Sequence, residues 1–406
     1  MKLQLQALLL IAATTLTAGC AEQAVAVKDS VTSWFGDAEQ KEEARREAAR
    51  LSPAVLDKKF ESTLAVKELW DGRFGKGSDD LYLKLLPAAL DGQIYTADHD
   101  GRMMAIDATS GKVVWEERDK KRRISGGPGV GEGLVYVGTS KAQVVARDAA
   151  TGKKRWVANV SSEILAAPHA AEGVVVVRTG DGKLYALDAQ TGKEKWVFDR
   201  TIPTLNLRGT AAALIHNGMV IAGFDNGRLN ALDLETGREL WETRLAEPSG
   251  RSELERLVDI DAEPVIRDDT AYLDSFQGRV AAVSLGDGSL EWTRDISSYT
   301  EVAVDDENVY ITDERGYVWA ISRADGSSVW QYKKLKNRQL TGPMRYKGYV
   351  VFGDFEGYLH WLDAATGKLV ARQRIDNKRI IAPPIDIGGA VAAYSSSGKM
   401  AAFSAE

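Results

Sequence analysis

The amino-acid sequence predicts an all-β fold: a single eight-bladed β-propeller of four-stranded antiparallel blades, closed by pairing of an N-terminal strand with the C-terminal blade. Three observations support this prediction. A strand-turn-strand stretch recurs eight times, at intervals of 38 to 51 residues. Two further strand patterns precede each copy, and the two ends of the repeat region complement each other. Self-similarity at such a period indicates a repeat architecture rather than a series of unrelated domains.

The repeated stretch is clearest from Gly182 to Trp196. Lys183 to Asp188 has apolar residues between polar ends, and we predict a half-buried strand there. Asp188 to Gly192 has turn chemistry, because the carboxylate accepts backbone N–H groups and glycine tolerates a positive φ. Trp196 then lies on the returning strand. We interpret the aspartates at this position as turn caps and not as a ladder of functional carboxylates, since serine replaces them in three copies.

Each repeat also contains two strand patterns before this stretch. One is apolar and follows a glycine, as in the segments that begin at Gly92 and Gly133. The other is shorter and rich in small residues, as in the segment from Ile124. Four short strands in about 40 residues are typical of a propeller blade. In such a blade the first-to-second and third-to-fourth turns share one face, so the links between blades are expected on the other.

The two ends of the repeat region predict how the ring closes. The last copy stops after its third strand, at Phe403. The segment from Val66 to Trp70 reads VKELW and matches the ending GRELW of the copy that begins at Gly227. We therefore expect the N-terminal segment to supply the missing fourth strand and to remove the open sheet edges.

Seven tryptophans occupy one repeat position, and seven alanines occupy another. We interpret the tryptophans as wedges between neighbouring twisted sheets rather than as an aromatic ligand cage, because a ligand site would not need one ring per blade. The alanines mark a third strand with little room. The seventh copy has Trp361 at the alanine position and Ala371 at the tryptophan position, which we interpret as a local exchange of bulk. The regular positions are Trp70, Trp115, Trp156, Trp196, Trp241, Trp292 and Trp330, and Ala105, Ala146, Ala186, Ala231, Ala282, Ala320 and Ala402.

Residues 1–19 are predicted to be a lipoprotein signal peptide, because a basic residue, an apolar stretch and small residues lead to Cys20. Cys20 is the predicted lipidation site, and Ala21 after it resembles the pattern for sorting to the outer membrane. The alternative is an uncleaved apolar segment with a buried cysteine; the stretch is too short to span a bilayer. Residues 20–60 are predicted to be a tether, either a partly helical spacer or a disordered one. The propeller is predicted to cover 61–406.

Composition and motifs argue against several function classes. The net charge of −6 does not favour binding to nucleic acid, because proteins that bind nucleic acid usually have a basic surface. One cysteine allows neither an intramolecular disulfide nor a cysteine-based metal site. The four histidines occupy unrelated repeat positions without metal-ligand spacing. The sequence contains no Walker loop, G-x-S-x-G elbow or EF-hand loop, so we predict no catalytic residue and no metal ligand.

Departures from the repeat indicate a partner-binding surface. The link after the third copy contains Leu205, Leu207 and Arg208, and the longest link, after the fourth copy, contains Asp259 and Asp261. Links of adjacent blades lie side by side, so we expect these residues to form a contact with an apolar centre and charges that orient the partner. The alternative is that the leucines fix their own loop while the arginine pairs with the aspartates.

Three other links are basic: 118–123, 333–338 and 372–379. They are expected on the same face, across the ring from the two aspartates. We hypothesise that they make a secondary electrostatic contact with anionic lipid headgroups or with an acidic partner surface. The alternative is ordinary solvated charge.

The repeat pattern A-h-D-x-x-T-G-x-x-x-W, in which h is apolar, resembles the blades of quinoprotein dehydrogenases. The lipoprotein signal, the eight repeats and the segments 205–209 (LNLRG) and 252–264 (SELERLVDIDAEP) together resemble the BamB family. These are lipoproteins of the outer-membrane β-barrel assembly machinery.

The BamB resemblance implies a non-catalytic scaffold without a cofactor, anchored by lipid to the outer membrane and facing the periplasm. It implies that the periplasmic domain of BamA is the partner, with unfolded outer-membrane proteins as further candidates. The implied contact residues are Leu205, Leu207, Arg208, Asp259 and Asp261. The alternative is a quinone-dependent periplasmic dehydrogenase. Several of those enzymes have extra insertions, an acidic Ca²⁺ site and adjacent cysteines, none of which we identify in this sequence.

Overall fold

The computed structural model describes residues 52–77, 83, 85–199, 211–224, 226–245, 260, 262–275 and 278–405. The chain divides into two compact units, Met1–Pro53 and Ala54–Glu406, and the repeats belong to the second. Every regular element in the described ranges is a β-strand, which confirms the all-β prediction. None of these ranges contains a helix long and apolar enough to cross a membrane.

The strands form eight four-stranded antiparallel sheets, numbered blades one to eight in chain order. Blades one to three contain β2 (Ala88–Leu90), β3 (Gln93–Ala97), β4 (Arg102–Asp107), β5 (Val113–Arg118), β6 (Ile124–Gly131), β7 (Leu134–Thr139), β8 (Gln143–Asp148), β9 (Lys154–Asn159), β10 (His169–Ala171), β11 (Val174–Arg178), β12 (Leu184–Asp188) and β13 (Glu194–Phe198). Blades four to six contain β14 (Leu214–His216), β15 (Met219–Phe224), β16 (Arg228–Asp233), β17 (Glu239–Arg244), β18 (Val265–Arg267), β19 (Thr270–Leu273), β20 (Val280–Ser284), β21 (Leu290–Arg294), β22 (Ala303–Val304), β23 (Asn308–Thr312), β24 (Val318–Ser322) and β25 (Ser328–Tyr332). Blades seven and eight contain β26 (Met344–Tyr346), β27 (Tyr349–Gly353), β28 (Tyr358–Asp363), β29 (Leu369–Arg374), β30 (Ile385–Asp386), β31 (Val391–Tyr394), β32 (Lys399–Ala405) and β1 (Val66–Arg73).

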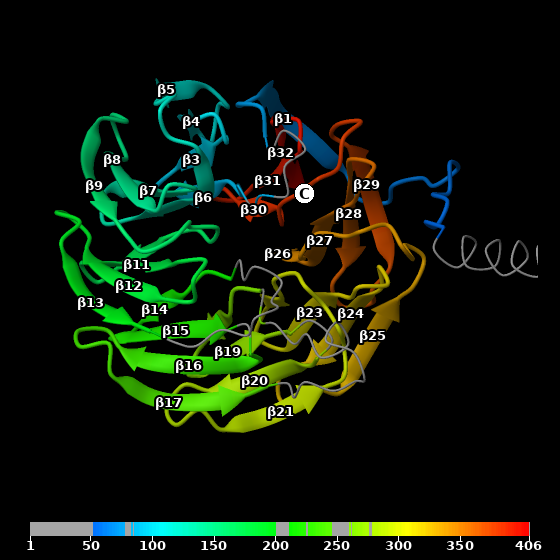
Figure 1. Ribbon diagram of the computed structural model, residues 1–406. Helices are drawn as coiled ribbons and strands as arrows, with labels where there is room; N and C mark the ends of the chain where they lie inside the picture. Colours follow the sequence, from blue (N-terminus) through cyan, green and yellow to red (C-terminus); the bar gives the residue numbers. More distant parts are fainter. Residues whose placement is uncertain are drawn as a thin grey trace, which may run out of the picture. The chain divides into compact units, whose positions relative to one another are not determined.

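The blades are arranged in a ring around a common centre. In Figure 1 the first strands, such as β6, β26 and β30, lie near the middle, and the fourth strands, such as β13, β17 and β21, lie at the rim. First strands of neighbouring blades contact one another, for example β2 with β6 and β22 with β26. The second strands are the most buried, and every residue of β11 is buried. The core therefore lies between adjacent blades. Because the second strands are buried on both faces, their sequences are continuous apolar runs.

The ring closes by pairing the two ends of the repeat region, as predicted. β1 runs antiparallel to β32 and is the outer strand of blade eight, in the order β1-β32-β31-β30. Val66 lies opposite Ala405, and Trp70 lies opposite Ala402. The N-terminal strand thus completes the sheet that the C-terminal strands leave unfinished, and this removes an open edge.

The tryptophans wedge between neighbouring blades, which confirms the sequence-based interpretation. The Trp196 indole N–H of blade three donates to the Leu234 carbonyl of blade four at 2.8 Å. The same ring lies against Gly237 of blade four, where an added Cβ would come within 2.6 Å of the indole. This glycine therefore provides both a positive φ of 70° and room for the ring. The same contact joins Trp70 to Gly111, Trp115 to Gly152, Trp156 to Gly192, Trp241 to Gly288, Trp292 to Gly326 and Trp330 to Gly367.

The recurrent alanines lie opposite the tryptophans within each sheet. Ala186 on β12 pairs with Trp196 on β13, and the alanine is completely buried. Cross-strand partners share one face of a sheet, so the small alanine leaves space for the large ring. In blade seven the two residues are exchanged: Trp361 on β28 pairs with Ala371 on β29. The inferred exchange of bulk is therefore a direct contact.

The turn aspartates cap their own turns. Asp188 Oδ1 accepts hydrogen bonds from the Thr191 backbone N–H at 2.8 Å and from the Thr191 hydroxyl at 2.6 Å. The hydroxyl and backbone donors lower the pKa of Asp188, because they stabilise its charged form. In blade five the residue at this repeat position is Ser284, and Asp287, three residues later, caps the turn instead. Its carboxylate accepts the Ser289 backbone N–H at 3.0 Å. The carboxylates are thus used by the fold, as the sequence predicts.

Candidate partner-binding face and channel mouth

The described links between blades lie on one face of the propeller, together with the second-to-third-strand turns. Asp119, just after blade one, donates its backbone N–H to the Gly101 carbonyl at 2.9 Å. Ile375, just after blade seven, donates in the same way to Gly357 at 2.9 Å. These bonds join each link to a turn of the preceding blade. We call this surface the link face, and the structure thus has the shared face that the sequence predicts.

The predicted contact residues and the predicted lipidation site lie outside the described residues: Leu205, Leu207, Arg208, Asp259, Asp261 and Cys20. Their mutual contacts stay a prediction. The described residues that flank the two links do show where each link meets the propeller.

Both links are anchored at blade four. Ala211, where the first link enters the blade, is buried, and so is Leu245, where the second link leaves it. Ile260, inside the second link, is also completely buried. It packs against Gly223 of β15, where an added Cβ would come within 2.4 Å of the Ile260 side chain. The first link therefore ends, and the second begins, on the sheet of blade four.

The first basic link, 118–123, is partly neutralised by neighbouring carboxylates. Arg118 and Arg123 both pair with Asp100, at 3.2 and 2.7 Å. The side chain of Lys121 is exposed. The two arginines are therefore paired with a carboxylate of blade one, and the two lysines of the link are exposed.

The second basic link, 333–338, ends in a buried ion pair that sequence reasoning missed. Arg338 is 2 % exposed and pairs with Asp354, which is 0 % exposed, at 2.8 Å. Its guanidinium also pairs with Glu356 at 2.5 Å and donates to the Ala54 carbonyl at 2.9 Å. The turn pattern D-x-x-G signals a capping role for the aspartate. An arginine at the end of a basic run carries no such signal, because it looks like solvated charge.

A buried histidine completes this cluster. His360 Nε2 lies 2.9 Å from Asp354 Oδ2, and its ring stacks on Phe352 at 5.6 Å. Burial lowers the pKa of His360, so the neutral ring donates its Nε2 proton to the aspartate. Burial acts to raise the pKa of Asp354, but the hydrogen bond from His360 and the charge of Arg338 outweigh it and lower that pKa. The cluster holds blade seven to the link before it.

The residues before β1 form a strap along blades six and seven. Ala54 donates its N–H to the Lys336 carbonyl at 2.8 Å. Arg372 donates to the Asp57 carbonyl at 2.6 Å, and its guanidinium lies over the Phe60 ring at 5.4 Å. The segment 372–379, predicted as the third basic link, therefore begins inside β29, and Arg372 holds the strap from that strand.

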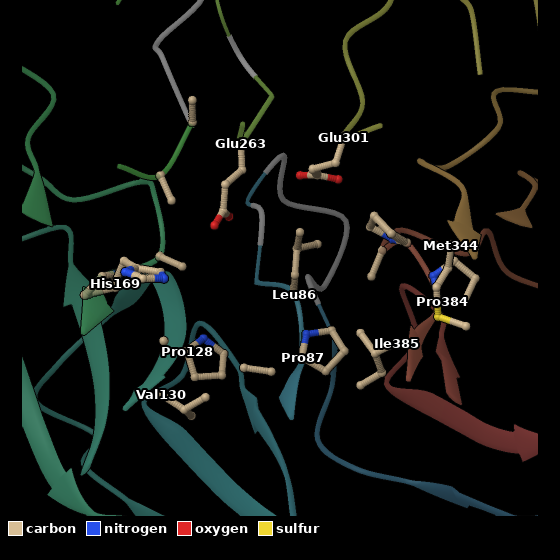
Figure 2. Close-up of a pocket in the computed structure, with 18 of the residues that line it drawn as sticks. Leu86, Pro87, Pro128, Val130, His169, Glu263, Glu301, Met344, Pro384 and Ile385 are labelled. Atoms are coloured by element: carbon tan, nitrogen blue, oxygen red, sulfur yellow. The ribbon is translucent and has the colours of Figure 1, made fainter. Parts of the chain in front are cut away.

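A cavity of about 460 Å³ lies at the mouth of the central channel, where the links reach the first strands. All eight blades contribute to its lining. Figure 2 shows mainly apolar side chains around it. These include Leu86, Pro87, Pro128, Val130, Met344 and Ile385.

In the described part of the chain, three ionisable side chains line the channel mouth: His169, Glu263 and Glu301. His169 Nδ1 accepts the Ile215 backbone N–H at 3.3 Å, and burial lowers the pKa of the histidine, so its ring is neutral at pH 7. Figure 2 shows both glutamate side chains extending into the cavity. Among the described residues that line the cavity, none is a lysine or an arginine. Within the part of the chain that the structure describes, no group of three acidic, histidine or cysteine side chains is placed to hold a metal ion.

Comparisons with known proteins agree with this architecture. Residues 99–332 match a family model described as outer membrane protein assembly factor BamB. The BamB proteins of Xanthomonas campestris and Pseudomonas aeruginosa are 37 % and 42 % identical, over 92 % and 87 % of this chain and 93 % and 92 % of their own lengths. BamB of Escherichia coli K12 is 32 % identical over 85 % of this chain and 90 % of its own.

Solved structures show the same fold. The crystal structure of BamB from Moraxella catarrhalis superimposes with a TM-score of 0.76 at 26 % identity, over 84 % of this chain and all of that one. Quinohemoprotein alcohol dehydrogenase from Comamonas testosteroni gives a TM-score of 0.66 at 15 % identity, over 86 % of this chain and 78 % of the enzyme, which shows a shared fold alone. The identity and coverage of the curated relatives decide the family, and the chain belongs to the BamB family of outer membrane protein assembly factors.

Proposed function

We propose that the chain is a non-catalytic scaffold lipoprotein of the outer-membrane protein assembly complex, which binds the periplasmic domain of BamA and assists insertion of β-barrel proteins. Its family supports this, because its relatives are named for outer membrane protein assembly. The contact residues in this proposal are Leu205, Leu207, Arg208, Asp259 and Asp261.

The observation that carries the proposal is the anchoring of both links at blade four. Ala211 and Leu245 are buried where the links meet the blade, and Ile260 fixes the longer link at a further point. A surface built on a rigid sheet loses little conformational freedom on binding, which favours affinity. Two leucines with an arginine and two aspartates supply an apolar centre and complementary charge for a protein partner.

The proposal includes an outer-membrane location with the propeller facing the periplasm. A single acyl chain gives only marginal anchoring, so several chains on Cys20, palmitate among them, would hold the protein at the membrane surface. Unfolded outer-membrane proteins are the proposed clients of the complex that the scaffold supports.

A quinone-dependent dehydrogenase is the second candidate, because quinohemoprotein enzymes share the fold. Pyrroloquinoline quinone carries three carboxyl groups, whereas the described residues that line the channel mouth include Glu263 and Glu301 and no basic side chain. Like charges in a partly enclosed site repel, so the described residues do not fit this cofactor. Absorbance of the purified protein after addition of quinone and Ca²⁺ tests the point, and a bound cofactor with turnover would overturn the scaffold proposal.

Co-purification with BamA tests the scaffold proposal. The triple variant L205A/L207A/R208A is expected to lose BamA, because it removes the apolar centre and one orienting charge. The matched control is V113A/V114A on β5, whose side chains are 46 % and 48 % exposed and lie on an outer strand. Both proteins are expected to melt like wild type. Retention of BamA by the triple variant at the wild-type level would refute the proposed contact.

A further inference from the structure

Two basic segments of the link face meet at one turn of blade seven. The second basic link reaches the turn between β27 and β28, where the Phe355 N–H donates to the Arg338 carbonyl at 3.2 Å. The segment 372–379 reaches the same turn, because the Ile375 N–H donates to the Gly357 carbonyl at 2.9 Å. Positive charges that are separate in the sequence therefore gather around this turn.

The strap adds two further lysines beside the same turn. Arg372 holds the strap at the Asp57 carbonyl, and the next two residues are lysines. The exposed lysines of the strap and of the two basic segments form a surface that we call the lysine patch. Its members are Lys58, Lys59, Lys334 and Lys378, all with exposed side chains.

The carboxylates of these segments already have donors, whereas the patch lysines have no acidic partner among the described residues. Glu356 pairs with Arg338 at 2.5 Å, and Asp376 accepts two serine hydroxyls at 2.7 and 2.5 Å. Asp57 accepts the Lys59 backbone N–H at 2.8 Å. No described carboxylate forms an ion pair with the ammonium group of a patch lysine. Within the described ranges, the patch therefore presents positive charge that the propeller does not itself neutralise.

Chain connectivity favours a membrane as the surface that this charge meets. The chain enters the propeller at Ala54, whose N–H bonds to the Lys336 carbonyl close to the patch. Residues 21–53 separate this point from Cys20 and reach about 110 Å at most. A lipid on Cys20 would therefore keep the patch near the bilayer. A weak attraction becomes effective when a tether keeps the two surfaces close.

We propose that the lysine patch docks the propeller on an anionic lipid surface, so that the link face at blade seven is turned toward the membrane. Lysine suits mobile phosphate headgroups, because its ammonium group is a point charge on a flexible stem. Each lysine that reaches an anionic surface raises the affinity by about fivefold. The proposal rests on the proposed function for the lipid at Cys20, but the charge attraction itself does not need that lipid.

Flotation with vesicles tests the attraction on residues 20–406 with the substitution C20S, so that no lipid on the protein contributes. The vesicles contain equal parts of phosphatidylcholine and phosphatidylglycerol, or phosphatidylcholine alone. The protein is expected to bind the anionic vesicles at least about tenfold more tightly than the neutral ones, and to be released as salt is raised. K58Q/K59Q/K334Q/K378Q is expected to weaken binding to the anionic vesicles by about tenfold or more, because it removes four positive charges.

The matched control is K112Q/K153Q/K193Q/K368Q, which removes four exposed lysines from third-to-fourth-strand turns. These turns lie on the face opposite the links; in blade seven, for example, the Ala364 N–H donates to the Gly348 carbonyl of the first-to-second-strand turn at 2.9 Å. The control changes the net charge by the same amount and is expected to bind like wild type. Both variants alter only exposed side chains, and the salt dependence of the unsubstituted patch tests the charge even if a variant folds poorly.

The proposal is overturned if the C20S chain does not bind anionic vesicles, if salt has no effect, or if the two quadruple variants bind equally well. Wild-type vesicle binding by the patch variant, together with loss of BamA in co-purification, would assign the patch to a protein partner and overturn it as well. Because the flotation uses neither a lipid on Cys20 nor BamA, failure of the proposed function would leave its result unchanged.

Discussion

Trp361 and Ala371 lie directly opposite each other on β28 and β29, and both side chains are completely buried. In the other seven blades the tryptophan is on the fourth strand and the alanine on the third. Blade eight explains the exception. Its fourth strand is β1, so it has no third-to-fourth-strand turn and no turn glycine for a ring at position 371 to cover. Instead the strap lies there: Thr63 donates to the Val370 carbonyl at 2.8 Å, and Leu64 joins the cluster around Trp361.

Restoring the common pattern in blade seven is expected to destabilise the protein. W361A removes a buried ring and is expected to lower the free energy of unfolding by about 3–5 kcal/mol. A371W overpacks the site and is expected to cost about 1–3 kcal/mol. The double variant W361A/A371W is expected to stay less stable than wild type, because position 371 faces the strap rather than a turn glycine. Urea unfolding measures all three, and a double variant as stable as wild type would contradict this account.

Two glycine substitutions separate backbone strain from ring contact. Gly237 and Gly218 have nearly the same positive φ, 70° and 73°, so alanine is strained by a similar amount at both. At Gly237 the new Cβ would come within 2.6 Å of Trp196, while nothing lies within 4 Å at Gly218. G237A is expected to lose about 1–3 kcal/mol more than G218A. Equal losses in denaturant titrations would show that the wedge contact contributes nothing.

The buried ion pair in blade seven predicts a large effect of a single change. R338A leaves Asp354 buried without its cation and is expected to cost about 3–5 kcal/mol. The control K334A removes an exposed charge from the same link and is expected to stay within about 0.5 kcal/mol of wild type. Because Arg338 also holds Ala54, R338A is expected to speed tryptic cleavage in the strap. Unchanged cleavage would show that the strap is held without this arginine.

His360 predicts a loss of stability below neutral pH. Burial lowers its pKa in the folded state, below the unfolded value of about 6.5. The unfolded chain therefore takes up the proton first as pH falls. The contribution is complete above about pH 6.5 and is lost as pH falls from there through the folded pKa. H360Q is expected to have a smaller difference in unfolding free energy between pH 7.5 and pH 5.5 than wild type. An unchanged difference would exclude His360 as its source.

Residues that repeat are the ones whose roles the sequence predicts well. Trp196 and Gly237 each have an equivalent residue in most other blades. Their regular spacing therefore indicates a structural role that is repeated between successive blades. Blade closure is predictable for the same reason, because Trp70 completes the series. Both predictions come from aligning the repeat copies of this chain with one another.

Residues that occur once are harder to interpret. Arg338 donates to the carbonyl of Ala54, which lies far away in the sequence. No sequence pattern around either residue predicts this contact. Glu263 and Glu301 each read as a solvated charge near a link, and only the ring brings them to one cavity. The partner-binding prediction came from interruptions of the repeat together with a family resemblance. Its five residues lie outside the described part of the chain, so it stays a prediction.

Closure by β1 and β32 has a consequence for chains that are cut short. The two strands pair across more than three hundred residues of sequence, so this sheet is the last that a chain made from its N-terminus is able to finish. Until then β1 has no partner within its own sheet. A chain that ends before β32 would keep two unsatisfied strand edges, on β1 and β31, which favour aggregation. A chain that terminates before β32 is therefore expected to aggregate even when its other seven blades are folded.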